Sequence, residues 1–203
     1  MSNKMQKAVR GRPRAFDEGA VLARAQQIFL EQGFEATSYD HVAAEVGLAK
    51  PSLYNAFGDK AALFERAVAD YARHAHAAIL GAFAGAPTLA EAGRAVLMAG
   101  AEVYSKPDGA STGCLLVGTA LPACAVIEGP RQTLTHFIAG LEVALELSIA
   151  QRFAKDAQRA GKSPRALALL LTSLLFSLAV RARQGLSRRK LRAVAAELGD
   201  LFR

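Results

Sequence analysis

A short helix that begins near Pro51 separates apolar from polar side chains in a way that suits contact with a polyanion. Its apolar residues recur at the spacing of one buried face: Leu53, Ala56 and Phe57. The other side carries Lys50, Ser52 and Asn55, with Tyr54 at the border. Ammonium, hydroxyl and amide groups on a short helix can hydrogen-bond phosphates and base edges in the major groove of DNA. The pattern therefore favours a nucleic-acid contact face.

The preceding residues predict the helix and turn that would position this face. Thr37 with Asp40 three residues later resembles a capping box and opens a second short helix. That helix ends at Gly47, which supplies a tight turn. Residues 37–57 thus have the anatomy of a helix-turn-helix, whose second helix enters the major groove.

The formal net charge of +7 is concentrated in two segments that contain no acidic residue. The first contains Lys4, Lys7, Arg10, Arg12 and Arg14, and the second contains Arg181, Arg183, Arg188, Arg189, Lys190 and Arg192. Residues 1–13 lack apolar periodicity and include Gly11 and Pro13, so we expect a flexible basic arm. Basic arms contact DNA phosphates or enter the minor groove. We expect Arg12 and Arg14 to do so.

The helix-turn-helix segment resembles the signature of the TetR family of bacterial transcriptional regulators. The matching positions are Thr37, Val42, Ala43, Gly47, Leu48, Leu53, Tyr54, Phe57, Lys60 and Leu63. The stretches GRPRAFD at 11–17 and PSLYNAFGDK at 51–60 are similar to one branch of that family, and the resemblance covers residues 11–74. It implies a dimeric repressor that binds a palindromic operator in double-stranded DNA.

The resemblance also implies which residues meet DNA. It assigns phosphate contacts to Thr37, Tyr54 and Lys60, and the groove face to Lys50, Pro51, Ser52 and Asn55. Ser38 and Tyr39, at the start of the helix predicted to end at Gly47, belong to the same expected contacts. The alternatives are a half-buried place in the core for Tyr54, a favourable helix-end charge for Lys60 and a solubilising tail for the arm.

The rest of the chain predicts helices and no strand. Apolar residues make up 52% of the sequence, and helix formers dominate over β-branched and aromatic residues. Helical periodicity, with caps at Asp17, Asp59, Thr88 and Ser163, predicts an all-α fold of about nine helices. We expect three parts: an arm at 1–13, a helix-turn-helix DNA-binding domain at 14–74, and a helical effector-binding and dimerisation domain at 75–203.

An apolar helix near the C-terminus predicts a partner chain. Residues 166–180 are almost uniformly apolar, and a domain of this size cannot easily cover such a helix on every side. The stretch is shorter than the ~18 to 20 residues that span a bilayer. The family resemblance implies that the last two helices, residues 164–202, form a homodimer bundle; an internal core helix is the alternative.

The resemblance further implies a pocket for a small apolar effector among the middle helices. The candidates for its lining are Tyr71, Met98, Tyr104, Cys114, Leu116, Phe137, Leu141 and Phe176. Ordinary core packing is the alternative for each of them. An effector would lower DNA affinity by favouring a dimer whose reading helices no longer match the groove spacing, with the fourth helix as the lever.

Oxidation of Cys114 offers an alternative signal. This residue stands in STGCLLV near the start of a helix, where backbone N–H groups can lower the pKa of a thiol. Cys124 lies ~15 Å further along a continuous helix, too far for a disulfide within the chain unless Pro122 bends the path. Two cysteines and no secretory signal favour a reducing, cytoplasmic location.

No pattern indicates an enzyme, a metal site or a cofactor. His74 and His76 fall on different sides of a helix, unlike the i, i+4 pair that binds zinc. His41 and His136 have no ligating neighbours in the sequence, and no glycine-rich phosphate loop follows a strand. A membrane-surface role for the basic run at 181–192 is the remaining alternative class, although a solvated helix junction explains that run as well.

Overall fold

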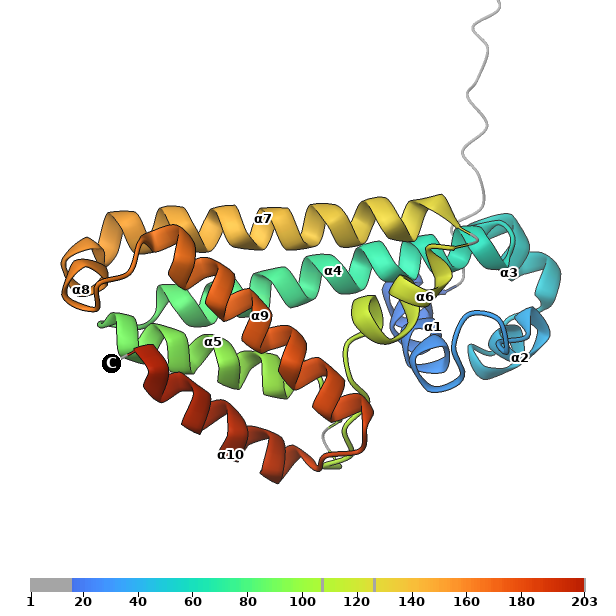
Figure 1. Ribbon diagram of the computed structural model, residues 1–203. Coiled ribbons are helices and arrows are strands. Elements are labelled where there is room, and N and C mark those ends of the chain that lie inside the picture. Colours follow the sequence, from blue (N-terminus) through green and yellow to red (C-terminus); the bar gives the residue numbers. More distant parts are fainter. Residues whose placement is uncertain (1–15, 107, 126, 203) are drawn as a thin grey trace, which may run out of the picture.

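The computed structural model describes residues 16–106, 108–125 and 127–202 and shows an all-helical protein (Figure 1). Over these residues the chain forms ten α-helices, one π-helical turn and one 3-10 turn, and the β-type pairing there is an isolated bridge between Ser105 and Ser111. The predicted all-α class is confirmed. The expected arm, with Arg12 and Arg14, lies outside the described residues.

Three short helices form the N-terminal end: α1 (Glu18–Gln32), α2 (Tyr39–Glu45) and α3 (Lys50–Phe57). The Asp17 carboxylate accepts the Gly19 N–H at 2.8 Å and caps α1, as predicted. An aromatic cluster joins α1 to the helix that follows α3, on which Phe64 lies. The ring centroids of Phe29 and Phe34 lie 4.8 and 4.9 Å from that of Phe64. These elements therefore pack as one unit.

Helix α4 (Lys60–Ala84) begins in this unit and runs along the length of the C-terminal half (Figure 1). That half comprises α5 (Leu89–Val103), α7 (Glu128–Arg152), α9 (Pro164–Arg183), α10 (Arg188–Gly199) and a 3-10 turn (Asp200–Phe202). Helix α4 packs against α1, α5 and α7, while α9 lies across α7 and α5, and α10 covers α5. One continuous helix thus connects the two ends of the molecule.

The structure departs from the predicted nine helices at two places. The predicted seventh helix, from Pro130 to about Ala160, is divided at Phe153 into α7 and α8 (Ala154–Arg159). Phe153 leaves the helical conformation, with φ of −127°, and packs its buried ring 5.7 Å from that of Phe83. The predicted sixth helix is a π-helical turn (Leu116–Ala120) that continues into α6 (Leu121–Ala123).

Close approach between helices holds α9 and the C-terminal turn on α5. A Cβ atom on Gly100 would lie 2.4 Å from a methyl carbon of Leu175 on α9, and one on Gly93 would lie 2.6 Å from the Phe202 ring. Only glycine fits these two positions of α5 without displacing the neighbouring side chain. By length and composition alone, α7 and α9 could each span a membrane, a test that core helices of soluble proteins also pass.

Candidate nucleic-acid interface

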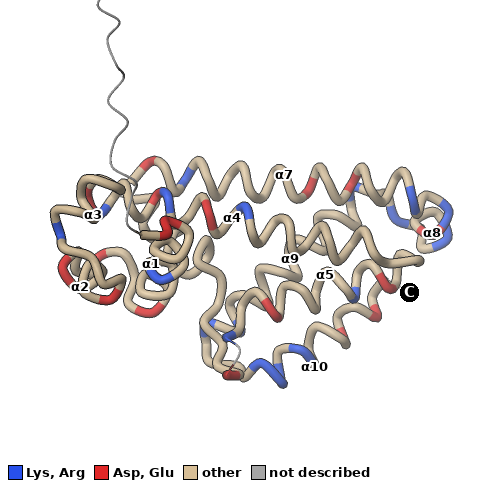
Figure 2. Tube along the Cα trace, turned by 180° about the vertical axis from the view of Figure 1, so that it is seen from behind, with Lys and Arg blue, Asp and Glu red and all other residues tan. Residues whose placement is uncertain are grey.

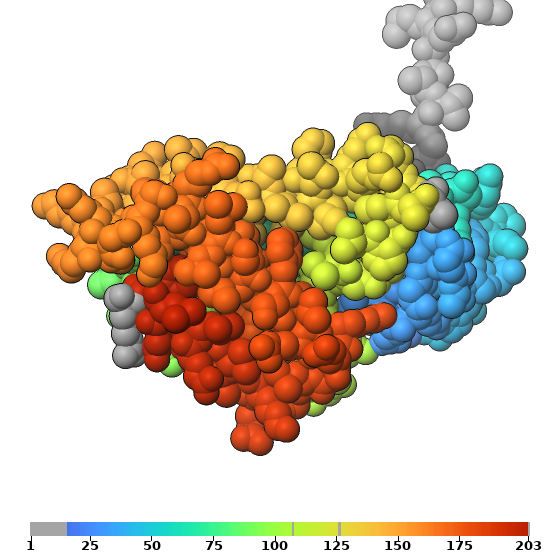
Figure 3. Space-filling view, in the orientation of Figure 1, coloured from blue at the N-terminus to red at the C-terminus, as the bar shows by residue number. Residues whose placement is uncertain are grey.

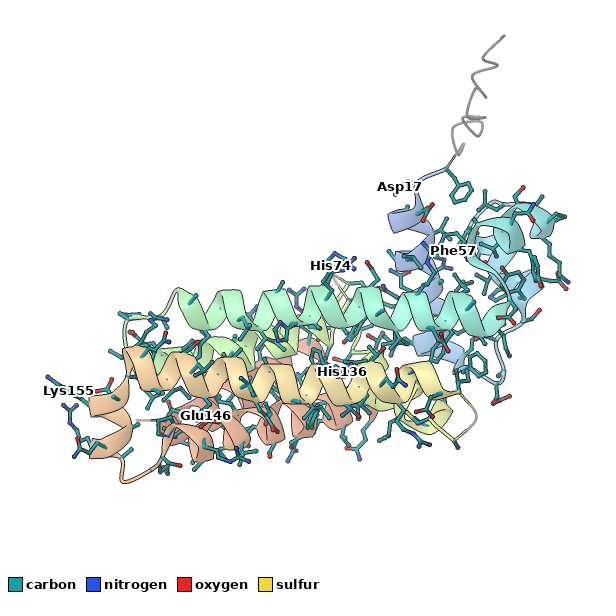
Figure 4. All side chains as sticks on the ribbon, turned by 90° about the horizontal axis from the view of Figure 1, so that it is seen from above. Asp17, Phe57, His74, His136, Glu146 and Lys155 are labelled. Carbon is teal, nitrogen blue, oxygen red and sulfur yellow. The ribbon has the colours of Figure 1, made fainter. Side chains whose placement is uncertain are left out.

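Helix α3 presents the polar face that its sequence predicts. Leu53 and Phe57 are buried against the core, whereas the Tyr54 side chain is 57% exposed. Lys50, Pro51, Ser52 and Asn55 are exposed as well. Figure 4 shows this end of the molecule, with Phe57 labelled. The helix therefore offers five neighbouring residues to a binding partner while two apolar anchors fix it to the domain.

The turn before α3 is built as a helix-turn-helix requires. Gly47 has φ of +68°, in the left-handed region that favours glycine. Its N–H donates to the Ala44 carbonyl at 3.1 Å, and the Leu48 N–H donates to the Ala43 carbonyl at 3.0 Å. These bonds close the end of α2 and direct the chain into α3.

Lys50 already has a partner within the domain. Its ammonium nitrogen lies 2.8 Å from Oδ1 of Asp40 on α2, and both side chains are more than half exposed. An exposed ion pair of this kind contributes little to stability and exchanges readily with another anion. A phosphate would therefore compete with Asp40 for the ammonium group.

The start of α2 corrects the expected N-cap and gives the Thr37 side chain an internal partner. Ser38, not Thr37, is the N-cap, since its hydroxyl oxygen accepts the His41 N–H. The Thr37 side chain is buried, and its hydroxyl donates to the Gly33 carbonyl at 2.6 Å. A phosphate contact through this hydroxyl would require an internal hydrogen bond to break. Tyr39 is similarly engaged, because its hydroxyl donates to the Gly58 carbonyl at 2.7 Å.

Lys60, for which a phosphate contact is predicted, makes internal hydrogen bonds in this structure. Its ammonium group donates to the carbonyls of Phe34, Glu35 and Thr37 at 3.0 to 3.3 Å. It also lies 4.4 Å from the centroid of the Phe34 ring. A lysine has three N–H donors, and here all of them are used to hold the connection between α1 and α2.

Arg66 on α4 is a residue of this unit that the sequence interpretation missed. Its guanidinium donates to the Ala56 carbonyl at 2.9 Å and to the Glu18 carboxylate at 2.7 Å, and it stacks on the Phe57 ring at 4.5 Å. It therefore joins the end of α3 to the start of α1. Neither helical periodicity nor a capping pattern marks such a residue, because its partners come from two other helices, α1 and α3.

The charge of the helix-turn-helix unit is opposite to that of the arm. Residues 16–67 contain four basic and eight acidic residues, a net charge of −4, whereas residues 1–15 contain five basic and no acidic residues. Figure 2 shows acidic positions around α2. Within residues 1–67, the positive charge that can attract a polyanion is therefore concentrated in the arm.

Three polar contacts from the C-terminal half hold the last turn of α1. Arg183 on α9 donates to the Leu30 carbonyl, and Lys106 pairs with Glu31. The Thr119 hydroxyl in the π-helical turn donates to the Phe29 carbonyl at 3.3 Å. The carbonyls at the end of a helix lack N–H partners further along the helix, so Arg183 and Thr119 supply donors there, while the Lys106–Glu31 pair is a side-chain contact. Arg183 thereby links α9 directly to α1.

The residues expected to line an effector pocket are divided between several environments. Leu116, Phe137 and Leu141 are buried in the core, and Met98 and Phe176 are half-buried. Tyr104 and Cys114 are buried, and the half-buried Tyr71 lies beside them. Burial raises the pKa of the Cys114 thiol, which is the opposite of the lowered value that the redox alternative requires. Both Cys114 and Cys124 are free thiols.

The second basic run forms internal pairs at the junction of α9 and α10. Arg188 and Arg192 both pair with Glu102 on α5, the latter at 2.8 Å. Arg183 reaches α1, and Arg181 approaches Ser177 on its own helix at 3.5 Å. Four of the six basic residues of the run are thus engaged in contacts within the protein, in agreement with a helix junction.

Comparison with known proteins connects this geometry to a group of regulators. The family model described as "Bacterial regulatory proteins, tetR family" matches residues 21–67. The chain is 28% identical over 210 residues to the HTH-type transcriptional repressor BdcR of Escherichia coli, covering the whole of this chain and 98% of BdcR. It is 44% identical over 64 residues to the repressor ComR of the same species, covering 32% of this chain and 30% of ComR.

Two solved structures of TetR family regulators have a fold similar to that of this chain. A cysteine mutant of the TetR family regulator CifR, solved with 26-bp operator DNA, superposes with a TM-score of 0.75 and 28% identity, covering 93% of this chain and 98% of that one. A TetR family regulator from Agrobacterium tumefaciens has a TM-score of 0.73 at 18% identity, which shows the fold alone, with 90% of this chain and 95% of that one covered.

Proposed function

The chain belongs to the TetR family of helix-turn-helix transcriptional regulators, and from this premise we propose that it is a repressor that binds a palindromic operator as a homodimer. The observation that carries the proposal is the exposed polar face of α3 on a buried apolar base. Similarity to BdcR, a repressor, and to CifR, which was solved on operator DNA, supports it. The family is not enzymatic, so this face binds and does not catalyse.

We assign the groove contacts to Lys50, Pro51, Ser52 and Asn55, and a phosphate contact to Tyr54. All of these residues are exposed, which supports the assignment. Among the contacts described for their side chains, the internal partner is that of Lys50, which pairs with Asp40. Arg12 and Arg14 of the arm would add phosphate or minor-groove contacts. In this proposal residues 14–74 read the DNA, and residues 75–203 pair the chains and receive the signal.

The homodimer would form through α7 and α9, which changes the interface expected from the sequence. Helix α10 was predicted to supply half of it, but its apolar stripe, including Leu191 and Ala195, is buried on α5. Large apolar side chains are instead exposed on α7 and α9: Val143, Leu147, Leu169 and Val180, which are between 39% and 55% exposed. Figure 3 looks onto α9 and α7 where they lie together on the surface.

Helical periodicity places further small or apolar residues in the same two rows. Gly140 and Ala150 share the outer side of α7 with Leu147, and Phe176 shares the outer side of α9 with Val180. Two adjacent helices with outward apolar rows are suited to a four-helix bundle with a second copy. We therefore reassign Phe176 from the effector pocket to the proposed interface.

Relief by a small effector and a cytoplasmic location complete the proposal. A ligand that stabilises a different spacing of the two α3 helices would lower operator affinity, because paired half-sites fix that spacing at about one helical turn, ~34 Å. A regulator of transcription acts on chromosomal DNA, which supports the location.

Selection of duplex DNA from a random pool tests the proposed function. The full chain should enrich a two-fold symmetric sequence, and sedimentation should show two chains or a multiple of two on each duplex. Leu147→Lys should give monomers with weaker operator binding, whereas Leu201→Lys, at an equally exposed site outside α7 and α9, should stay dimeric. Failure to enrich any sequence would contradict the proposal.

A further inference from the structure

Helix α3 is held by few buried side chains for an element that must meet DNA in one orientation. Its eight residues bury two of them, Leu53 and Phe57, which lie about one turn apart on the same side of the helix. Anchors in a single row hold a helix against its neighbours but restrain its rotation about that row only weakly. A contact beside this row would set the angle at which Ser52 and Asn55 point outward.

Arg66 on α4 supplies such a contact at the end of α3. One terminal nitrogen of its guanidinium donates to the Ala56 carbonyl at 2.9 Å. This carbonyl belongs to the last turn of α3, where the helix has no further N–H groups to offer. The guanidinium carbon also lies 4.5 Å from the centroid of the Phe57 ring. One side chain thus touches both the backbone and a buried anchor at this end of the helix.

The other terminal nitrogen of Arg66 reaches the start of α1. It donates to the carboxylate of Glu18, in the first turn of α1, at 2.7 Å. The Phe57 ring lies 6.1 Å from that of Phe16, which directly precedes the N-cap of α1. Arginine presents its donors in a rigid plane, so the two hydrogen bonds and the stacked ring together fix the direction of the guanidinium. Arg66 therefore joins α4 to the end of α3 and to the start of α1.

This bridge is better suited to setting an angle than to adding stability. The Arg66 and Glu18 side chains are 42% and 30% exposed, and ion pairs with that exposure contribute little to folding. Recognition of base edges, in contrast, needs side chains placed to within about 0.5 Å and 10–20°. We infer that Arg66 is a positioning residue for operator recognition, which sets the angle of α3 on α1 and α4 without itself contacting DNA. This inference rests on the proposed function.

The ratio of affinities for the selected operator and for a scrambled duplex of equal composition tests this role. Arg66→Met keeps much of the side-chain length and removes both donors, so the ratio should fall about fivefold, the effect of misaligning one base contact. A variant that only loses folded protein binds both duplexes less well by the same factor. A purely structural defect therefore leaves the ratio unchanged.

Arg24→Met is the matched control. Arg24 lies on α1 of the same unit and pairs with Glu45 at the end of α2, so this variant removes the same charge and an exposed ion pair between two helices. The described contacts of the Arg24 side chain are with Glu45 and Gln27, not with α3. The ratio in this variant should stay within about twofold of wild type. An equal fall in Arg24→Met and Arg66→Met would overturn the inference.

Arg66→Lys separates the forked geometry from the charge. Lysine keeps the positive charge but carries a single nitrogen, which cannot reproduce the two-sided contact of a guanidinium. Affinity for the scrambled duplex should therefore equal that of wild type, while the ratio of affinities stays low. A ratio equal to that of wild type would show that the charge is sufficient and would contradict the inference.

Salt dependence separates positioning from a direct contact with DNA. If Arg66 neutralised a phosphate, Arg66→Met would reduce the slope of log affinity against log salt by about one unit for each bound chain. Positioning predicts the same slope as in Arg24→Met, and a smaller slope in Arg66→Met alone would contradict it.

The wild-type ratio distinguishes failure of this inference from failure of the proposed function. Wild-type protein that does not distinguish the operator from the scrambled duplex would contradict the proposed function itself. Wild-type protein that distinguishes them, together with an unchanged ratio in Arg66→Met, would contradict only the role of Arg66.

Discussion

Asp40 restrains the one basic residue of the α3 face. Its carboxylate pairs with Lys50 at 2.8 Å. A phosphate that binds Lys50 must therefore displace the carboxylate or be repelled by its negative charge. Asp40→Asn should therefore raise DNA affinity about threefold at low salt, since exposed pairs of this kind are worth well under 1 kcal/mol. The gain should shrink as the salt concentration rises, and fluorescence anisotropy with labelled duplex measures both effects.

Glu35→Gln is the matched control for this substitution. Glu35 is an exposed acid of the same unit that lies in the connection before α2 and not beside Lys50. The substitution removes the same charge as Asp40→Asn but does not free the Lys50 ammonium group. Equal gains from both variants would mean that only the overall charge matters, which would contradict a specific role for the Lys50–Asp40 pair.

At the residue scale, the sequence predicts which side of α3 is exposed. It does not predict the hydrogen bonds that residues near α3 make within the protein. Helical periodicity fixes the outward positions of Lys50, Ser52 and Asn55 because it depends only on spacing. Thr37 and Lys60 differ, since they bind carbonyls of the connection between α1 and α2. Those acceptors take their places only after the chain has folded, so no spacing rule reveals them.

At the scale of elements, Arg183 connects the proposed dimer helix α9 to α1. Its guanidinium donates to the Leu30 carbonyl in the last turn of α1. Arg183→Met keeps much of the side-chain length and removes the donor, so the free energy of unfolding should fall by about 1–2 kcal/mol. Hydrogen exchange should become faster in the last turn of α1, and chemical denaturation with exchange mass spectrometry measures both.

Arg181→Met provides the comparison on the same helix. Arg181 is exposed and its guanidinium approaches only its own helix, at Ser177, in the described contacts. This variant should leave both the stability and the exchange of α1 close to wild type. Equal protection of α1 in Arg183→Met and wild type would show that the link between α9 and α1 is not needed.

The order of the helices could be predicted from sequence, while their partners could not. Caps at Asp17, Asp59, Thr88 and Ser163 act where the sequence places them, because capping is a local interaction. The burial of α10 on α5 depends instead on close approach at Gly93, where the Phe202 ring fits. An amphipathic pattern shows that a helix has an apolar side, not which surface covers it.

At the scale of the whole molecule, attraction to DNA and recognition of DNA are assigned to different segments. The helix-turn-helix unit has a net charge of −4, and the arm supplies the opposing positive charge. Replacing Arg12 and Arg14 with alanine should therefore reduce the slope of log affinity against log salt by about three to four units in a dimer, because each of two arms loses two phosphate contacts. Operator titrations at several salt concentrations measure this slope.

Alanine at both Arg189 and Lys190 is the control for net charge. These residues belong to the second basic run, on the exposed side of α10. The same loss of charge there should leave the slope unchanged. A slope that falls equally in both double variants would contradict a specific role for the arm.

The most direct test of the central claim, that α3 reads DNA, is the ratio of affinities for the selected operator and for a scrambled duplex of equal composition. Asn55→Ala removes one exposed amide and leaves the buried anchors Leu53 and Phe57 in place. Each good base contact contributes about 1–3 kcal/mol of discrimination, so the ratio should fall at least fivefold while affinity for the scrambled duplex stays the same. An unchanged ratio after Asn55→Ala, and again after Ser52→Ala, would contradict the claim.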